Sequence, residues 1–192
     1  MGSLSPVYHA SPLKRQRNRR TIYGFQQRSL IDPLIEVFNG PTLDLSCERR
    51  ETSIVPTQSF ALFNSQFSHD MALAWAAKVD GRKLDRDDTI TRAFLEAYGR
   101  EPESGELEAS RAYLAKTTEW HRKTPPPAKP ARKPVIHKII SELTGQVAEF
   151  VQQGDPENYE ANLHPSDVKP ETRALADFML ALLNSNEFVY VY

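Results

Sequence analysis

The chain has 192 residues, of which 40% are hydrophobic, enough to fill the core of one domain with or without an appendage. Its formal net charge of -1 excludes an overall field that would attract nucleic acid or an anionic membrane. A single cysteine excludes an internal disulfide and any cysteine-based zinc or iron–sulfur site within one chain.

Charge is distributed unevenly along the chain, and residues 122–138, like its start, carry basic residues and no acid. Residues 1–30 carry one lysine, five arginines and no acid, which is typical of solvated surface or of an arm that docks on an acidic partner. The segment has no apolar h-region, so we expect no secretory signal in it. No apolar run approaches the roughly 20 residues that a membrane-spanning helix needs, and we expect no membrane span.

The first elements are short. Residues 1–19 are polar and show no periodicity, so they are predicted to form a flexible basic arm. Residues 20–26 alternate in polarity, which predicts a short strand. Asp32 is a suitable N-cap and Pro33 suits the first helical position, so a short helix is predicted over 34–38.

Four longer helices are predicted next, from apolar residues at helical spacing. The first begins at Pro56, and the second runs over 66–79. The third is capped by Asp85 or Asp88 and ends at Gly99. The fourth lies within REPESGELEASRAYLAKTTEWHRK.

A proline-rich stretch interrupts the helical pattern. TPPPAKPARKP has five prolines in eleven residues, which predicts an extended linker over 124–134. Residues 135–153 then show the clearest helical period of the chain, and with the loop after them they are predicted to form an inserted helix and loop over 135–168. Its apolar positions are Ile136, Ile139, Ile140, Leu143, Val147, Phe150 and Val151.

The C-terminal segment 169–192 is predicted to complete a helical core that begins at 20–123. Pro170 opens a last helix, and residues 187–191 are predicted to form a strand that pairs with 20–26. The fold class is therefore mainly α, with five or six helices and one short two-stranded pairing.

The loop SCERRETSIVPTQ holds the cysteine. Arg49 and Arg50 follow Cys47 and would favour a reactive thiolate, but a lone loop cysteine is more often a small packing residue. The two arginines either form ion pairs with acids, which holds the loop, or bind the carboxylate, sulfate or phosphate of a ligand. The packing and ion-pair interpretations are favoured, and the others stay open.

Motifs of established chemistry are missing from the sequence. It contains no HExxH, CxxCH, GxGxxG, P-loop or GxSxG pattern. We therefore expect no metal site and no cofactor in this chain.

Three separated blocks together resemble the C-terminal domain of the DUF1553 (PSD1) family of large planctomycete surface proteins. They are RRTIYGFQQRSLIDPLIEVFNGPTLDLSCERRETSIVPTQSFALFNSQF, AFLEAYGREPESGEL and LALLNSNEFVYV. Tyr98, Ser185 and Tyr192 depart from the residues usual in the family, and the stretch from Thr124 to Val168 resembles a lineage insertion.

The resemblance implies a context more than a mechanism. Such proteins are long and exported, and often carry a cytochrome-like domain with c-type haem upstream and a DUF1549-like domain between. The chain would then be the C-terminal piece of a periplasmic or cell-surface protein, with those upstream domains as its partners and any haem outside this chain.

Two functions remain under consideration, so whether the chain is an enzyme stays open. In the first, it is a non-catalytic structural or interaction module, in which Cys47 packs and Arg49 or Arg50 pairs with Glu187 or Glu101. In the second, the arginines bind an anionic glycan and Glu48, Glu101 or Glu187 acts as acid or base. Nucleic acid is disfavoured as a partner, because no folded basic face can be inferred.

The candidate binding residues come mainly from the blocks that carry the resemblance. Raised carboxylate pKa values in an open cleft would favour the enzyme, and closed ion pairs would favour the module. The candidates are Arg28, Arg49, Arg50, Arg100, Glu101, Asn184, Asn186 and Glu187.

Overall fold

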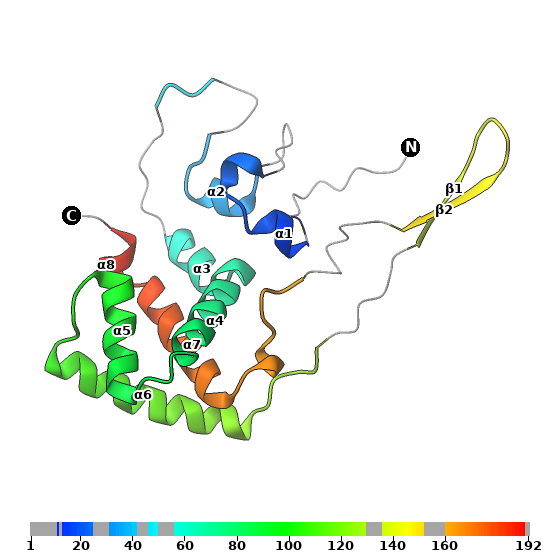
Figure 1. Ribbon diagram of the computed structural model, residues 1–192. Coiled ribbons are helices and arrows are strands. Elements are labelled where there is room, and N and C mark those ends of the chain that lie inside the picture. Colours follow the sequence, from blue (N-terminus) through cyan, green and yellow to red (C-terminus); the bar gives the residue numbers. More distant parts are fainter. Residues whose placement is uncertain are drawn as a thin grey trace. The chain divides into compact units, whose positions relative to one another are not determined.

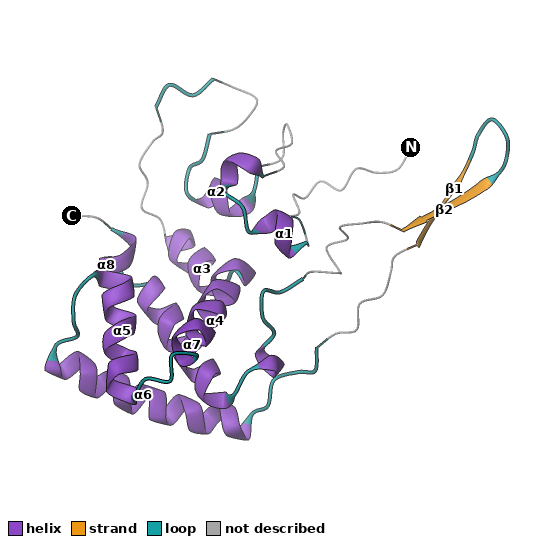
Figure 2. Cartoon of the chain, viewed as in Figure 1, coloured by secondary structure: helices purple, strands orange, loops and turns teal. Residues whose placement is uncertain are grey.

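The computed structural model describes residues 11, 13–24, 31–41, 46–49, 56–129, 136–151 and 160–190. The chain divides into two units, which are treated separately. One comprises Met1–Ser53 with Pro130–Ala161, and the other comprises Ile54–Lys129 with Asn162–Tyr192. Figures 1 and 2 show the elements of both units, most of which are helices.

The second unit is helical. Ser65 and Asp85 cap the starts of two of its helices through their side chains, and Gly99, in the left-handed conformation, ends the helix that Asp85 begins. No helix in the described part of the chain combines the length and apolarity needed to cross a membrane. The elements are α3 (Pro56–Asn64), α4 (Gln66–Asp80), α5 (Arg86–Tyr98), α6 (Ser104–Lys123), η3 (Pro165–Asp167), α7 (Pro170–Leu183) and α8 (Asn186–Val189).

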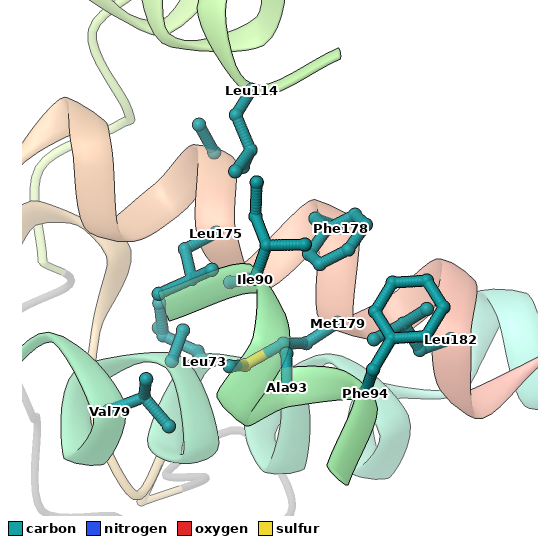
Figure 3. Close-up of a cluster of buried hydrophobic side chains, with 13 residues drawn as sticks. Leu73, Val79, Ile90, Ala93, Phe94, Leu114, Leu175, Phe178, Met179 and Leu182 are labelled. Atoms are coloured by element: carbon teal, nitrogen blue, oxygen red, sulfur yellow. The ribbon is translucent and has the colours of Figure 1, made fainter. Parts of the chain in front are cut away.

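Helix α7 is the centre of this unit and packs against α4, α5, α6 and α8. Its residues are apolar almost all round, as expected of a helix enclosed by others. Met179 of α7, Val79 of α4 and Ile90 of α5 are the largest fully buried side chains. Figure 3 shows the core side chains converging from α4, α5, α6 and α7. Burial of this apolar surface is the main stabilising term.

The first unit has short elements. Its helices are α1 (Lys14–Arg17), the 3-10 helix η1 (Thr21–Tyr23) and α2 (Pro33–Val37). The Asp32 side chain accepts a hydrogen bond from the Leu34 N–H at 2.9 Å, so the predicted cap of α2 is confirmed. The strands β1 (Ile136–Ile140) and β2 (Val147–Val151) form an antiparallel hairpin.

The helix predicted over 135–153 is wrong, because the segment forms this hairpin. Ile136 pairs with Val151 and Ile140 with Val147 in the register of the two strands. Gly145 has a φ of 66°, and its N–H donates to the carbonyl of Ser141 within the turn. A left-handed residue in the middle of the segment ends any helix there.

The strand pairing predicted between 20–26 and 187–191 is also wrong where the structure describes it. Thr21–Tyr23 is a 3-10 helix, and Asn186–Val189 is an α-helix whose N-cap, Ser185, accepts from the Phe188 N–H. Residues 25, 26 and 191 lie outside the described residues. The mainly α class is confirmed, whereas the division into arm, core, linker and insertion stays a prediction.

Candidate functional site

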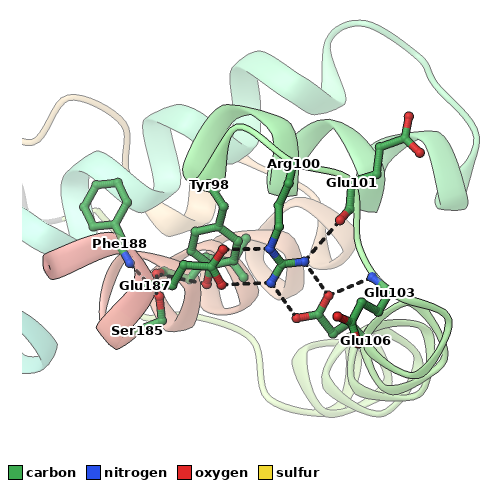
Figure 4. Close-up of polar contacts among 9 residues, drawn as sticks. Tyr98, Arg100, Glu101, Glu103, Glu106, Ser185, Glu187 and Phe188 are labelled. Carbon is green, nitrogen blue, oxygen red and sulfur yellow. Dashed lines mark hydrogen bonds and ion pairs between the residues drawn. The ribbon is translucent and has the colours of Figure 1, made fainter. Parts of the chain in front are cut away.

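A cluster around Arg100 joins three segments of the helical unit (Figure 4). Arg100 Nε and Nη2 donate to the two carboxylate oxygens of Glu187, at 2.7 and 2.8 Å. Nη1 and Nη2 donate to the two carboxylate oxygens of Glu106, both at 2.8 Å. Nη1 also donates to the Glu101 carbonyl at 3.1 Å. We call this set of contacts the Arg100 clamp.

Local structure places each member of the clamp. Gly99 ends α5 with a φ of 73°, which turns the chain and leads directly to Arg100. Glu106 lies in the first turn of α6, where its carboxylate also accepts from the Glu103 N–H at 2.7 Å. Glu187 lies in the first turn of α8. The clamp therefore ties the α5–α6 connection to the start of α6 and to α8.

The cation of Arg100 also lies near two aromatic rings of α5. Its guanidinium carbon is 5.6 Å from the centroid of the Phe94 ring and 5.5 Å from that of Tyr98. These distances allow cation–π attraction. Phe94 belongs to the buried core, so the clamp borders the core directly.

The electrostatics of the clamp are those of a closed ion pair. Hydrogen bonds from Arg100, with a further one from the Glu103 backbone, lower the pKa of Glu106 to about 2. Hydrogen bonds from Arg100 also lower the pKa of Glu187. Both carboxylates are therefore ionised at neutral pH and accept hydrogen bonds without donating any.

A second polar cluster joins α6 to α7 around the buried Arg173. Its Nη1 donates to the carbonyls of Pro165 and Val168, at 3.2 and 3.0 Å, and its Nη2 donates to the His121 carbonyl at 3.0 Å. Its Nε has no hydrogen-bond partner among the described residues. His121 lies in the last turn of α6, so the cation lies at the negative end of that helix.

A histidine–carboxylate contact accompanies Arg173. The His121 Nε2 lies 2.7 Å from the Asp177 Oδ2 of α7. Burial, and to a lesser extent the negative charge of Asp177, raise the pKa of the nearby Tyr113. These contacts hold α6 against α7.

The structure brings together three of the candidate residues. Arg100 and Glu187 form the clamp, and Glu101 contributes its carbonyl. Asn184 donates from Nδ2 to the Leu180 carbonyl at 2.7 Å at the end of α7, and Asn186 is the first residue of α8.

The candidates in the cysteine loop have a different outcome. Arg49 is exposed, whereas Arg50, like Arg28, lies outside the described residues. Cys47 is exposed, with its Sγ 3.3 Å from the Arg49 carbonyl, so the expectation that it packs is wrong. Glu187 binds Arg100 of its own unit, and the expected pairing of Arg49 or Arg50 with Glu187 or Glu101 stays a prediction.

Several residues of these clusters are not among the candidates, notably Glu106 and Arg173. Glu106 follows Glu103 by three residues at a helix start, and this capping-box spacing was a usable signal. Arg173 left no signal, because a buried arginine is rare and its partners are carbonyls. No three His, Cys, Asp or Glu side chains within the described ranges are grouped to hold a metal ion.

One comparison with known proteins gives a match. The family model PSD1, described as a protein of unknown function (DUF1553), matches residues 4–114. The matched region includes Arg100 and Glu106 and ends before Glu187. No curated protein and no solved structure matches the chain.

Proposed function

The chain belongs to the DUF1553 (PSD1) family, and we propose that it is a non-catalytic structural or interaction module at the C-terminal end of an exported multidomain protein. Its proposed partners are upstream DUF1549-like and cytochrome-like domains, and its proposed location is the periplasm or the cell surface. The observation that carries the non-catalytic part is the saturation of Arg100 by groups of its own unit.

A guanidinium has five N–H donors, and Arg100 makes five hydrogen bonds, to Glu101, Glu106 and Glu187. No donor is left for the sulfate or carboxylate of a glycan. An anion that bound here would have to displace a carboxylate held by two hydrogen bonds.

The pKa values support the same proposal. A general acid or base needs a pKa near the working pH, which for a carboxyl group means a raised value. The pKa values of Glu106 and Glu187 are lowered instead, because Arg100 stabilises their charged forms. Such a pair supports structure and not proton transfer.

The exposed apolar side chains of the helical unit support an interaction role. Phe60 and Phe63 of α3 and Phe67 at the start of α4 are all exposed, although each is large and apolar. Exposed apolar side chains that lie close together are typical of surfaces that contact other proteins or domains. Haem chemistry would belong to an upstream domain, because one cysteine cannot form the two thioether bonds of a CxxCH site.

The test uses the native protein from its source, captured with an antibody against this chain. We expect an intact mass well above the 21.8 kDa of the chain, together with a Soret absorption band. A native mass of 21.8 kDa without a Soret band would contradict the proposal of a multidomain haem-carrying parent.

A further inference from the structure

We propose that residues 14–23, here called the basic segment, bind an acidic polypeptide. The segment comprises α1, η1 and the residues between them, and five of its ten residues are basic. The chain contains no aspartate or glutamate before Asp32. This inference rests on the proposed function as an interaction module and names the chemistry of one partner.

The basic segment already binds one acidic residue of its own unit. The Lys14 N–H donates to the Glu160 carboxylate at 3.2 Å. The Arg17 guanidinium donates to the Glu160 carbonyl at 2.5 Å and to the Ser11 carbonyl at 3.1 Å. These contacts combine a carboxylate with peptide carbonyls, which is the chemistry that an acidic peptide offers.

Three arginines of the basic segment remain available. Arg15, Arg19 and Arg20 are exposed, and no ion pair or hydrogen bond of their side chains is found within the described part of the chain. Exposed guanidinium groups favour carboxylates, which they bind through two parallel hydrogen bonds. The three side chains are therefore available to bind the carboxylates of a partner.

Apolar side chains lie directly beside these charges. Ile22 is 76% exposed and Tyr23 is 70% exposed, and both lie in η1 immediately after Arg19 and Arg20. Aromatic residues and arginine are enriched where proteins contact one another. We infer that the bound peptide carries an aromatic or aliphatic residue next to its acids.

A polypeptide is a better fit than nucleic acid. Nucleic-acid affinity grows with the number of phosphates that are neutralised, which calls for a long basic surface. Here the basic segment spans only ten residues, in a chain whose net charge is -1. An acidic residue, Glu160, is among the contacts of the segment within its own unit.

The experiment measures binding by fluorescence anisotropy with three labelled probes: a glutamate–tyrosine copolymer, polyglutamate of equal charge and oligo(dT) of equal charge. We expect the full chain to bind the copolymer most tightly. The triple variant Arg15→Glu, Arg19→Glu, Arg20→Glu should bind it about tenfold more weakly or worse. Ile22→Ser with Tyr23→Ser should abolish the preference for the copolymer over polyglutamate.

The matched control is the triple variant Lys78→Glu, Lys83→Glu, Lys116→Glu. It changes the net charge equally at exposed cations of the helical unit, and should weaken binding by no more than about twofold. Circular dichroism checks that each variant keeps its helices. Equal losses in both triple variants, tighter binding of oligo(dT), or no binding of the copolymer would each overturn the proposal.

The result stays separable from the proposed function. The native mass and Soret band test the parent protein, whereas the probes test one surface of this chain. A stand-alone chain that binds the copolymer through the basic segment would remove the multidomain context and keep the interaction.

Discussion

Helix α7 and the β1–β2 hairpin have similar apolar patterns and different structures. Both segments show apolar residues at spacings of three and four. Those of α7 are mainly leucine, alanine, phenylalanine and methionine. Leucine, alanine and methionine are good helix formers, and Phe178 packs in the core of the helical unit. Those of the hairpin are mainly isoleucine and valine, which favour strands. Periodicity alone therefore did not distinguish the two structures.

The two regions also differ in burial. Most residues of α7 are buried against α4, α5 and α6. In the hairpin, Ile136, Ile139, Ile140 and Val147 are all more than half exposed. A two-stranded hairpin without a packed face is only marginally stable. We infer that the helical unit supplies the cooperative stability of the chain and that the hairpin contributes little to it.

The largest effect should come from a cavity in the core of the helical unit. Met179→Ala removes a side chain with 0% exposure and should lower the free energy of unfolding by about 2–5 kcal/mol. Urea denaturation followed by helical circular dichroism measures the change. Ile140→Ala, at a hairpin side chain that is 64% exposed, should change it by no more than about 0.5 kcal/mol. Equal losses would show that the hairpin shares the core's stability.

The next largest effect should come from the buried cation that joins α6 to α7. Arg173→Met fills a similar volume but leaves the carbonyls of Pro165, Val168 and His121 without their donor. The expected cost is about 1–3 kcal/mol, because buried acceptors without partners are destabilising.

Arg122→Met is the matched control for Arg173, because Arg122 also joins α6 to α7: it lies in the last turn of α6 and pairs with Glu171 of α7 at the surface. It should cost no more than about 1 kcal/mol. A smaller loss for Arg173→Met than for Arg122→Met would mean that water replaces the buried donor.

Glycine-to-alanine substitutions should have opposite effects on stability in the hairpin turn and in a helix. Gly145→Ala forces a side chain into a left-handed residue of the hairpin turn and should cost about 1–2 kcal/mol locally. Faster hydrogen exchange of the Ser141 N–H, which donates to the Gln146 carbonyl, would report it. The melting temperature of the helices should not change, because the hairpin adds little to their stability.

Gly105→Ala, in α6, should increase stability, whereas Gly145→Ala should decrease it. A side chain added there meets nothing within 4 Å, and the position is helical. Alanine should therefore stabilise the helical unit by up to about 1 kcal/mol. A lower melting temperature for Gly105→Ala would show that the start of α6 contacts something that the described residues do not provide.

Local signals gave most of what was correctly predicted. The caps at Asp32 and Asp85 and the stop at Gly99 depend on neighbours in the sequence, and the structure has all three. The hairpin was missed because a strand's stability depends on its partner strand, and because Gly145 was not weighed as a turn residue. Helix ends were therefore more predictable than the pairing of segments.

In the candidate site, too, contacts between residues far apart in the sequence were not predicted. Arg100 and Glu187 were both named, but they are 87 positions apart and nothing local pairs them. The partner expected for Glu187 was chosen from the cysteine loop, where Arg49 and Arg50 drew attention by their density of charge. Which charges meet is decided by the packing of α5 against α8, and packing was not readable from one sequence.

The smallest expected effect concerns acid stability and compares the Arg100 clamp with the hairpin's Lys138–Glu149 ion pair. The pKa of Glu106 is about 2 when folded, against an ordinary value of 4.5, so the clamp's contribution is fully present above pH 4.5 and is lost as pH falls toward 2. Glu187, whose pKa is also lowered, adds in the same direction. Arg100→Ala should therefore lower the urea midpoint at pH 7 and flatten its decline between pH 4.5 and pH 2. The change is modest because solvent screens side chains that are more than a third exposed.

Lys138→Ala should leave the curve unchanged, because it removes one exposed contact of 2.8 Å from a region that adds little to global stability. If Arg100→Ala declines as steeply as the parent chain, the acid sensitivity arises from other carboxylates, and the clamp positions α8 without stabilising it.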